Sequence, residues 1–293
     1  MDYGMTKKFT IQDVENLTGI KAATLRVWEK RFNFSRPQRI NGNRFYTLKD
    51  LELLIHISQL KDNGYPISKL ALLSAEAILV KTSQLDHNDD KYRFAINGLI
   101  ISMFSTDIFD FENYLNRYFN LCGVPNTLEK IIIPFLEKIN FLYATKAYNE
   151  VLIALTTIRG KIIYCIECLD FKRDSEKSAV LFLPKNEPFD LILLYVCYVL
   201  KSQGYKTIYL GTNIPEENIM IILKQNKPDQ LFTYVTHENN FNMPLLLKYI
   251  KEKHPGQKLN VLASNKTTLP LNEKTEVVNF MSHQQLSKQL LIA

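Results

Sequence analysis

The sequence is poor in the residues on which several protein classes depend. It has only four cysteines in 293 residues, too few for a disulfide framework. Its ten glycines leave little material for phosphate-binding loops, and it contains no Walker loop, nucleophile elbow or Gly-rich dinucleotide motif. The five histidines lack metal-ligand spacing. We therefore expect neither a catalytic constellation nor a metal site.

Long hydrophobic runs are also missing. No apolar segment reaches the roughly 20 residues that a membrane-spanning helix needs. The first eight residues lack the apolar region of a signal peptide. We expect a cytoplasmic protein with no membrane partner.

Two of the cysteines, Cys165 and Cys168, form a lone CxxC pair. Zinc binding would need a second pair of ligands, and redox chemistry would need an exposed thiol. Because the pair lies in the apolar, helix-like run from Ile162 to Leu169, we expect both cysteines to be buried packing residues.

Positive charge is concentrated near the N-terminus. Residues 1–83 hold 13 Lys/Arg and 8 Asp/Glu, which accounts for most of the net charge of +6. Between Lys21 and Lys49, eight cationic side chains accompany a single acidic one, Glu29, with aromatic residues between them. A solvated face is the ordinary explanation of a charge run, but an imbalance this local favours nucleic-acid binding.

The N-terminal segment has the pattern of a helix-turn-helix. Apolar residues recur at helical spacing over residues 11–17, with Thr10 as N-cap and Asp13 in the capping-box position. Gly19 can adopt the positive φ of a helix end. A second helix is predicted from about Lys21 to Phe32.

An extended, basic segment follows at residues 36–47. Its Asn41-Gly42 dipeptide predicts a two-residue hairpin turn, and we call this hairpin the wing. Thr47 then caps a helix that ends near Gly64, and Pro66 starts another.

The remainder of the chain predicts two further regions. Residues 90–169 are expected to form four helices joined by short loops, as in an antiparallel bundle. From residue 178 onward, strands alternate with helices, which predicts a doubly wound parallel sheet. The predicted strands are 178–184, 207–211, 230–235 and 260–263.

Together these patterns predict an α plus α/β fold: an N-terminal winged helix-turn-helix, a central four-helix bundle and a C-terminal Rossmann-like sheet. The predicted domains are 1–83, 88–172 and 176–293.

Three motifs follow one another in the first domain. Residues 24–29 read T-L-R-V-W-E, residues 37–39 read P-Q-R and residues 42–46 read G-N-R-F-Y. In this order they resemble the MerR family of winged helix-turn-helix transcription regulators. The resemblance implies that the second helix enters the major groove and that the wing reaches backbone phosphates.

The resemblance assigns DNA contacts to the second helix and the wing. Arg26 would project from the helix and contact a guanine edge or a phosphate. The candidate DNA-binding residues are Thr24, Arg26, Lys30, Arg31, Arg39, Arg44 and Tyr46.

Structural roles compete with some of these assignments. Arg26 could pair with Glu29 three residues later on the same helix. Tyr46 could be a core residue of the hairpin. Trp28 is expected in the core, because it belongs to the face that packs on the first helix.

The rest of the chain resembles the cobalamin-binding sensor half of light- and cobalamin-responsive MerR-type repressors. The marker is the segment 204–215, G-Y-K-T-I-Y-L-G-T-N-I-P. Such domains carry an E/D-x-H-x-x-G loop, whose histidine binds cobalt and whose glycine lets the ligand approach the backbone. Here the corresponding positions are Glu187, Phe189 and Ile192.

These substitutions remove the ligand chemistry that the resemblance implies. Phe189 has no lone pair for cobalt, and the branched side chain of Ile192 would intrude on the ligand. In the bundle, the Trp position of light-responsive members corresponds to Tyr143, and their Glu-His pair corresponds to Val151-Leu152. We expect no cofactor, and in particular no cobalamin bound in the manner of the family.

Several polar residues do not belong to these motifs. His56 lies in an apolar helix and is expected to be structural. His237, Asn213 and Asn239-Asn240 follow predicted strands, where doubly wound folds place ligands. The alternative for His237 is a loop histidine near Glu238.

The sequence therefore predicts a transcription regulator rather than an enzyme. We expect it to bind double-stranded DNA as a homo-oligomer, a dimer or a tetramer. It would act constitutively, or in response to a protein partner or a small molecule. The alternatives are a cobalamin-dependent, light-responsive repressor with non-histidine ligation, and a corrinoid-binding enzyme subunit.

Overall fold

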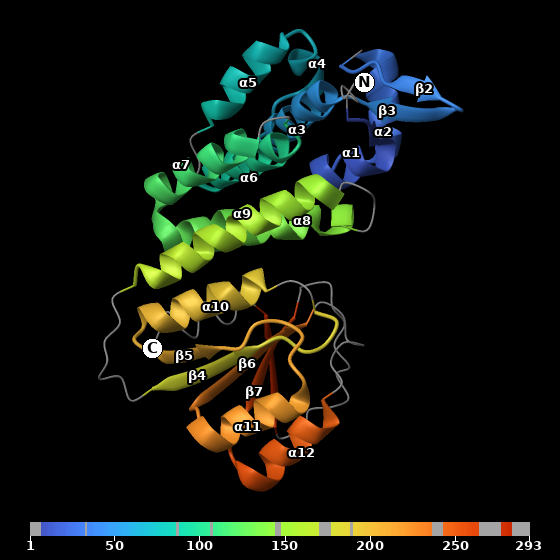
Figure 1. The fold of residues 1–293 in the computed structure, drawn as a ribbon. Helices are drawn as coiled ribbons and strands as arrows, with labels where there is room; N and C mark the ends of the chain where they lie inside the picture. Colours follow the sequence, from blue (N-terminus) through green and yellow to red (C-terminus); the bar gives the residue numbers. More distant parts are fainter. Residues whose placement is uncertain are drawn as a thin grey trace, which may run out of the picture. The chain divides into compact units, whose positions relative to one another are not determined.

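The computed structural model describes most of the chain (Figure 1). It divides into two compact units, residues 1–157 and 158–293, each of which is considered by itself. The division into three domains stays a prediction, since the first unit includes both the helix-turn-helix and much of the helical region. The described residues are 7–32, 34–85, 88–105, 108–143, 148–169, 177–187, 190–235, 243–263 and 277–282.

The first unit begins with the predicted winged helix-turn-helix. Thr10 and Asp13 form a reciprocal capping box at the first helix, and Gly19 closes it with φ 77°. Asn41 and Gly42 take φ 50° and 81°, the two positive values that a tight hairpin turn requires. The antiparallel sheet has the order β1-β3-β2. The elements are β1 (Phe9–Thr10), α1 (Ile11–Thr18), α2 (Ala22–Arg31), β2 (Gln38–Ile40) and β3 (Asn43–Tyr46).

A second capping box, between Thr47 and Asp50, starts α3 (Leu48–Asp62). A helix starts after Pro66 as predicted, but it is short, and a second short helix follows it. They are α4 (Ile67–Leu70) and α5 (Ala75–Ser83). The hydroxyl of Ser74 accepts a hydrogen bond from the Ala77 amide and so begins a new helix.

Helices continue through the second half of this unit. Gly123, with φ 72° and ψ 168°, breaks the helical path. The longest helix, α9, has 20 residues, and in the described part of the chain no helix is both long and apolar enough to cross a membrane. The elements are α6 (Asn88–Met103), α7 (Ile108–Asn126), the π-helix η1 (Thr127–Ile132), α8 (Ile133–Tyr143) and α9 (Tyr148–Glu167).

The second unit is a parallel sheet with helices on both faces (Figure 1). The strand order is β5-β4-β6-β7-β8, and all four pairings are parallel. Helix α10 covers one face, and α11 and α12 cover the other. The elements are β4 (Ser178–Phe182), α10 (Leu191–Ser202), β5 (Lys206–Tyr209), α11 (Glu216–Asn226), β6 (Gln230–Val235), α12 (Pro244–Lys253), β7 (Leu259–Ala263) and β8 (Val278–Ser282).

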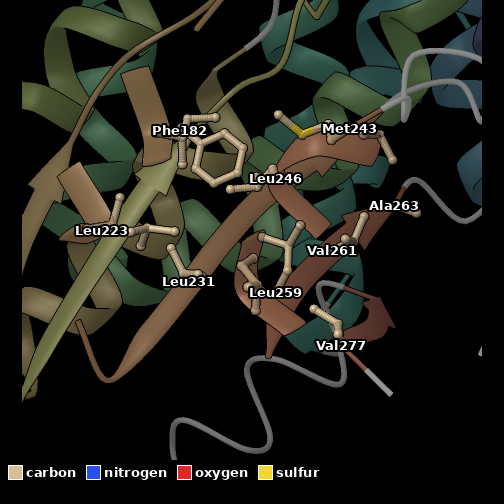
Figure 2. Close-up of a cluster of buried hydrophobic side chains, with 13 residues drawn as sticks. Phe182, Leu223, Leu231, Met243, Leu246, Leu259, Val261, Ala263 and Val277 are labelled. Atoms are coloured by element: carbon tan, nitrogen blue, oxygen red, sulfur yellow. The ribbon is translucent and has the colours of Figure 1, made fainter. Parts of the chain in front are cut away.

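The predicted fold class is confirmed, and the sequence missed only β8 at the edge of this sheet. On one face of the sheet, Phe182, Leu231 and Val261 come from three neighbouring strands (Figure 2). They pack with Leu223 of α11 and Leu246 of α12 in one buried cluster. This packing explains why the strands are nearly continuous apolar runs.

The expectation that the CxxC cysteines are buried is wrong. Cys165 is half-buried, and Cys168, which follows the last residue of α9, is exposed. Of the four cysteines, Cys197 on α10 is the buried one. Among the described residues, no group of three or more His, Cys, Asp or Glu side chains is arranged to hold a metal ion.

Candidate nucleic-acid interface

Helix α2 buries one face and exposes the other. Leu25 and Trp28 lie in the core, with exposed fractions of 2% and 6%, and the Trp28 ring packs edge-on against Phe34. The core placement predicted for Trp28 is confirmed. Arg26 and Lys30, one helical turn apart, are both exposed, so they share an outward face.

The two other candidates on this helix differ in accessibility. Thr24 is half-buried near the start of α2. Arg31 is exposed at its end, with its guanidinium 5.4 Å from the centre of the Phe32 ring. Lys30 and Arg31 also suit the last turn of a helix, where the backbone dipole is negative.

The first turn of α2 is anchored by a residue that the sequence analysis missed. Glu15 of α1 accepts hydrogen bonds from the Ala22 amide at 3.0 Å and from Lys21 Nζ at 3.1 Å. The bond from the Ala22 amide, followed by that from Lys21, lowers the pKa of Glu15. A carboxylate of the first helix thus orients the helix that carries Arg26. The acidic residue shortly before the Gly19 corner was the available sequence clue.

Glu29 connects α2 to the wing. Its Oε2 accepts from Arg44 Nε at 2.8 Å, and its Oε1 accepts from the Tyr46 hydroxyl at 2.5 Å. The side chains of Arg44 and Glu29 are only 17% and 12% exposed. The alternative in which Glu29 pairs with Arg26 is not the arrangement observed, since Glu29 bonds to the wing instead.

The placement of Tyr46 corrects its assignment as a phosphate contact. It is fully buried, and burial, reinforced by the bond to Glu29, raises its pKa. This is the core role that the sequence left as an alternative. Arg44 is half-buried and has one nitrogen committed to Glu29, so its first role is to hold the wing against α2.

Arg39 lies directly opposite Arg44 in the hairpin register and is exposed. The candidates that remain exposed therefore come from two elements. We call them the basic set: Arg26, Lys30, Arg31 and Arg39.

The positions of the degenerate cobalamin motif are distributed over both units. Ile192 is half-buried in the first turn of α10, and Glu187 is buried in the loop before it. Leu152 is half-buried on α9, and Tyr143 is the last residue of α8. Phe189 lies outside the described residues.

Asp190, at the start of α10, is the centre of a small polar cluster. Its Oδ2 accepts from Arg159 Nε at 2.9 Å and from the Tyr209 hydroxyl at 2.6 Å. The bond to Asp190 raises the pKa of Arg159, and burial followed by that bond raises the pKa of Tyr209. The Asp190 carboxylate, which lies between the motif positions Phe189 and Ile192, is therefore engaged by the protein itself.

Of the other ligand candidates, Asn213 lies in a left-handed turn after β5, with φ 58°. His237 and Asn239-Asn240 lie outside the described residues. His56 is structural, as predicted. It is buried beside Phe94, and burial lowers its pKa to about 4.

Comparison with known proteins agrees with this geometry. Residues 9–76 match the family described as MerR HTH family regulatory protein. Over 234 residues, the chain is 24% identical to the HTH-type transcriptional repressor CarA of Myxococcus xanthus. The alignment covers 75% of this chain and 73% of CarA. It is 31% identical over 97 residues to the HTH-type transcriptional regulator MlrA of Escherichia coli (strain K12), covering 32% of this chain and 40% of MlrA.

Among solved structures, the monomethylamine corrinoid protein of Methanosarcina barkeri aligns with a TM-score of 0.50 and 13% sequence identity. The alignment covers 69% of this chain and 97% of that one. At this identity the likeness concerns the fold alone.

The fold is a winged helix-turn-helix with an exposed basic set, followed by a Rossmann-like C-terminal unit. More specifically, residues 9–76 match the MerR HTH family, and the relatives CarA and MlrA are transcriptional regulators. The resemblance stated from the sequence motifs is confirmed.

Proposed function

We propose that this protein binds operator DNA in a sequence-specific manner, with α2 in the major groove and the wing over the flanking phosphates. The observation that carries the proposal is the division of α2 into a buried apolar face and an exposed cationic face. Arg39 extends the positive charge onto the wing. DNA offers regularly spaced phosphates beside a groove that admits one helix, and this surface suits both elements.

The residues of the basic set have different roles in this proposal. Arg26 lies closest to the start of α2 and contacts a base, since the N-terminal part of a recognition helix reaches base edges. Lys30, Arg31 and Arg39 bind phosphates, which position the protein without selecting a sequence. Thr24 contributes a further contact near Arg26.

The test is fluorescence anisotropy with a labelled duplex from the protein's own upstream region. Arg26→Ala is expected to weaken binding by roughly 5- to 150-fold and to relax sequence preference, the range for one lost bidentate base contact. Lys224→Ala is the matched control, because Lys224 is an exposed helical lysine in the second unit. Wild-type affinity and specificity in Arg26→Ala would contradict the proposed docking.

We also propose that the active form is a homo-oligomer, a dimer or a tetramer. Helix-turn-helix proteins commonly bind two half-sites separated by a helical turn, so a two-fold operator matches a two-fold protein. Light scattering of the free protein and of its DNA complex would give the stoichiometry. A monomer on a single half-site in both measurements would refute it.

The fold of the second unit resembles that of a corrinoid protein, so we asked whether its residues could hold cobalamin. The residues described around the ligand loop do not fit it well. Ile192 places a branched, half-buried side chain where the resembling domains have glycine, and the Asp190 carboxylate is bonded to Arg159 and Tyr209. We therefore propose a regulator that does not need cobalamin and responds to a protein partner or another small molecule.

The second candidate is a cobalamin-dependent repressor, which the resemblance to the cobalamin-responsive repressors favours. The two candidates can be distinguished by mixing the protein with adenosylcobalamin in the dark and passing the mixture over a desalting column. Loss of the ligand supports our proposal, and co-elution with an altered absorption spectrum supports the alternative. We propose no enzymatic role, since the curated relatives CarA and MlrA are transcriptional regulators.

A further inference from the structure

A chain of hydrogen bonds joins the helical bundle to residues 9–76, the segment that matches the MerR family and that we call the MerR-type segment or domain. Gln59 of α3 lies within the matched residues 9–76 and is fully buried. Its Nε2 donates to the Asp90 carbonyl at 3.0 Å, and its Oε1 accepts from Asn97 Nδ2 at 3.0 Å. Asn97 Oδ1 in turn accepts from Lys138 Nζ at 3.2 Å. We call this chain, from α8 through α6 to α3, the polar relay.

Two further bonds flank the polar relay, and both also join α3 to α6. Asn63 Nδ2 donates to Asp90 Oδ1 at 2.7 Å. Arg93 Nη2 pairs with Asp62 Oδ2 at 2.6 Å. The last two turns of α3 are thus held to the first turns of α6 by side chains that each have a specific partner.

A second contact lies at the start of the MerR-type segment. Phe9 of β1 packs edge-on against Phe104, which follows α6, with ring centres 4.8 Å apart, and both rings are buried. Lys7 lies 5.0 Å from the centre of the same Phe104 ring and forms an ion pair with Glu150 of α9. We call this group the N-terminal contact.

The chemistry of the polar relay is unusual for a contact that only stabilises. Lys138 is half-buried, and the hydrogen-bond acceptor described for it is an amide oxygen. Burial lowers its pKa to about 8. Arg93 adds to that effect, and Asp62 opposes it. An apolar side chain would avoid the desolvation of the ammonium group, so energy alone does not explain this lysine.

A buried polar chain does, however, select one arrangement of its elements. The carbonyl and the amino group of Gln59 and of Asn97 are both used. A shift of α3 along α6 would leave several of these atoms buried without partners, which is costly. Apolar residues slide past one another with a smaller penalty. The polar relay therefore specifies orientation.

We propose that the polar relay and the N-terminal contact clamp the MerR-type domain onto the helical bundle, so that α6, α8 and α9 set the orientation of the DNA-binding helix. That the clamp regulates DNA binding rests on the proposed function. That the contacts hold the two parts together does not depend on it. The basic set remains exposed in the clamped arrangement, so the clamp presents the recognition surface instead of covering it. Lys138 is the residue through which α8 acts on α3.

The chain carries its own probe for this proposal. Trp28 is the single tryptophan, and it is buried inside the MerR-type domain. The time-resolved anisotropy of its fluorescence in the full-length protein therefore reports how that domain tumbles. In the wild type we expect slow decay, because the domain turns together with the bundle.

Release of the clamp should add a fast decay component from independent motion of the small domain. The variants are Lys138→Met, Lys7→Met and the double variant, in which we expect the largest fast component. Lys130→Met is the matched control, because Lys130 is a half-exposed lysine on the neighbouring η1 and lies outside both contacts. It should decay like the wild type.

A fast component already present in the wild type would overturn the proposal, as would wild-type decay in the double variant. Should Lys138→Met fail to fold, Lys7→Met and the wild-type decay still test the clamp, since the Lys7 side chain is only partly buried, with 25% of it exposed. Arg26→Ala separates the two proposals. Lost DNA binding with unchanged Trp28 decay supports both, whereas retained DNA binding with slow decay refutes only the DNA docking.

Discussion

The bond network of Glu29 yields a quantitative prediction for the variant Glu29→Ala. The substitution leaves the Arg44 guanidinium and the Tyr46 hydroxyl without their acceptor in a site where Glu29 is 12% and Arg44 17% exposed. Removing one partner of a buried ion pair costs about 3–5 kcal/mol. Since the residual exposure lets water reach Arg44, we expect the lower end, about 3 kcal/mol.

The loss should appear as a lower melting temperature. For a unit of this size, 1 kcal/mol corresponds to roughly 2–4 °C, so Glu29→Ala should melt about 6–12 °C below the wild type. Circular dichroism follows the whole chain, and Trp28 fluorescence follows the domain that contains Glu29. Glu29→Gln retains a hydrogen-bond acceptor and should fall between the two.

Arg39→Ala provides the control, because Arg39 lies opposite Arg44 on the same hairpin but is exposed. Exposed substitutions usually change stability by less than about 0.5 kcal/mol. An unshifted melting temperature in Glu29→Ala would refute our assignment of Glu29 as the link between α2 and the wing. Equal destabilisation by Arg39→Ala would refute the contrast between the two arginines.

Three further predictions concern other groups. Arg39→Ala should weaken binding to all DNA sequences alike and reduce the slope of log affinity against log salt concentration by about 1. Fluorescence anisotropy over a salt series measures this slope. A change in sequence preference would contradict a phosphate contact. The folded protein holds the pKa of His56 near 4, below its usual value, so the stability contributed by neutral His56 is complete above about pH 6.5 and declines by about 3 kcal/mol as the pH falls to 4. Urea denaturation at several pH values should show this decline, and His56→Phe, which can still pack on Phe94, should lack it. Asp190→Asn should weaken the bonds to Arg159 and Tyr209 and lower the unfolding free energy by roughly 1–3 kcal/mol in denaturant titrations, and an unchanged value would argue against the cluster as a stabilising contact.

The amino-acid sequence by itself determined the features whose causes are local. The capping boxes at Thr10 and Thr47 involve side chains and amides three residues apart, so they form wherever the helix forms. The turn at Asn41-Gly42 depends on two residues that tolerate positive φ. The alternation of apolar strands with helices likewise reflects local periodicity, and it predicted the doubly wound sheet.

The same local logic explains two omissions. A helix starts after Pro66 as predicted, but the second helix, which begins at the Ser74 hydroxyl, was not predicted. Strand β8 follows a long polar segment of the sequence. Its own residues do not predict a strand, and the structure defines it through its parallel pairing with β7.

Only the tertiary structure decided the partners of the polar side chains that pair between distant parts of the sequence. Glu29 had Arg26 three residues away, yet it bonds to Arg44 and Tyr46, which are 15 and 17 positions along the chain. The bonds from Asn97 to Gln59 and from Lys138 to Asn97 span 38 and 41 positions. Such pairs form because packing of apolar faces brings distant helices together and excludes water, which then makes any unpartnered polar atom costly. Sequence therefore determined the helices and the hairpin, and packing decided which of their charges are exposed and which hold the protein together.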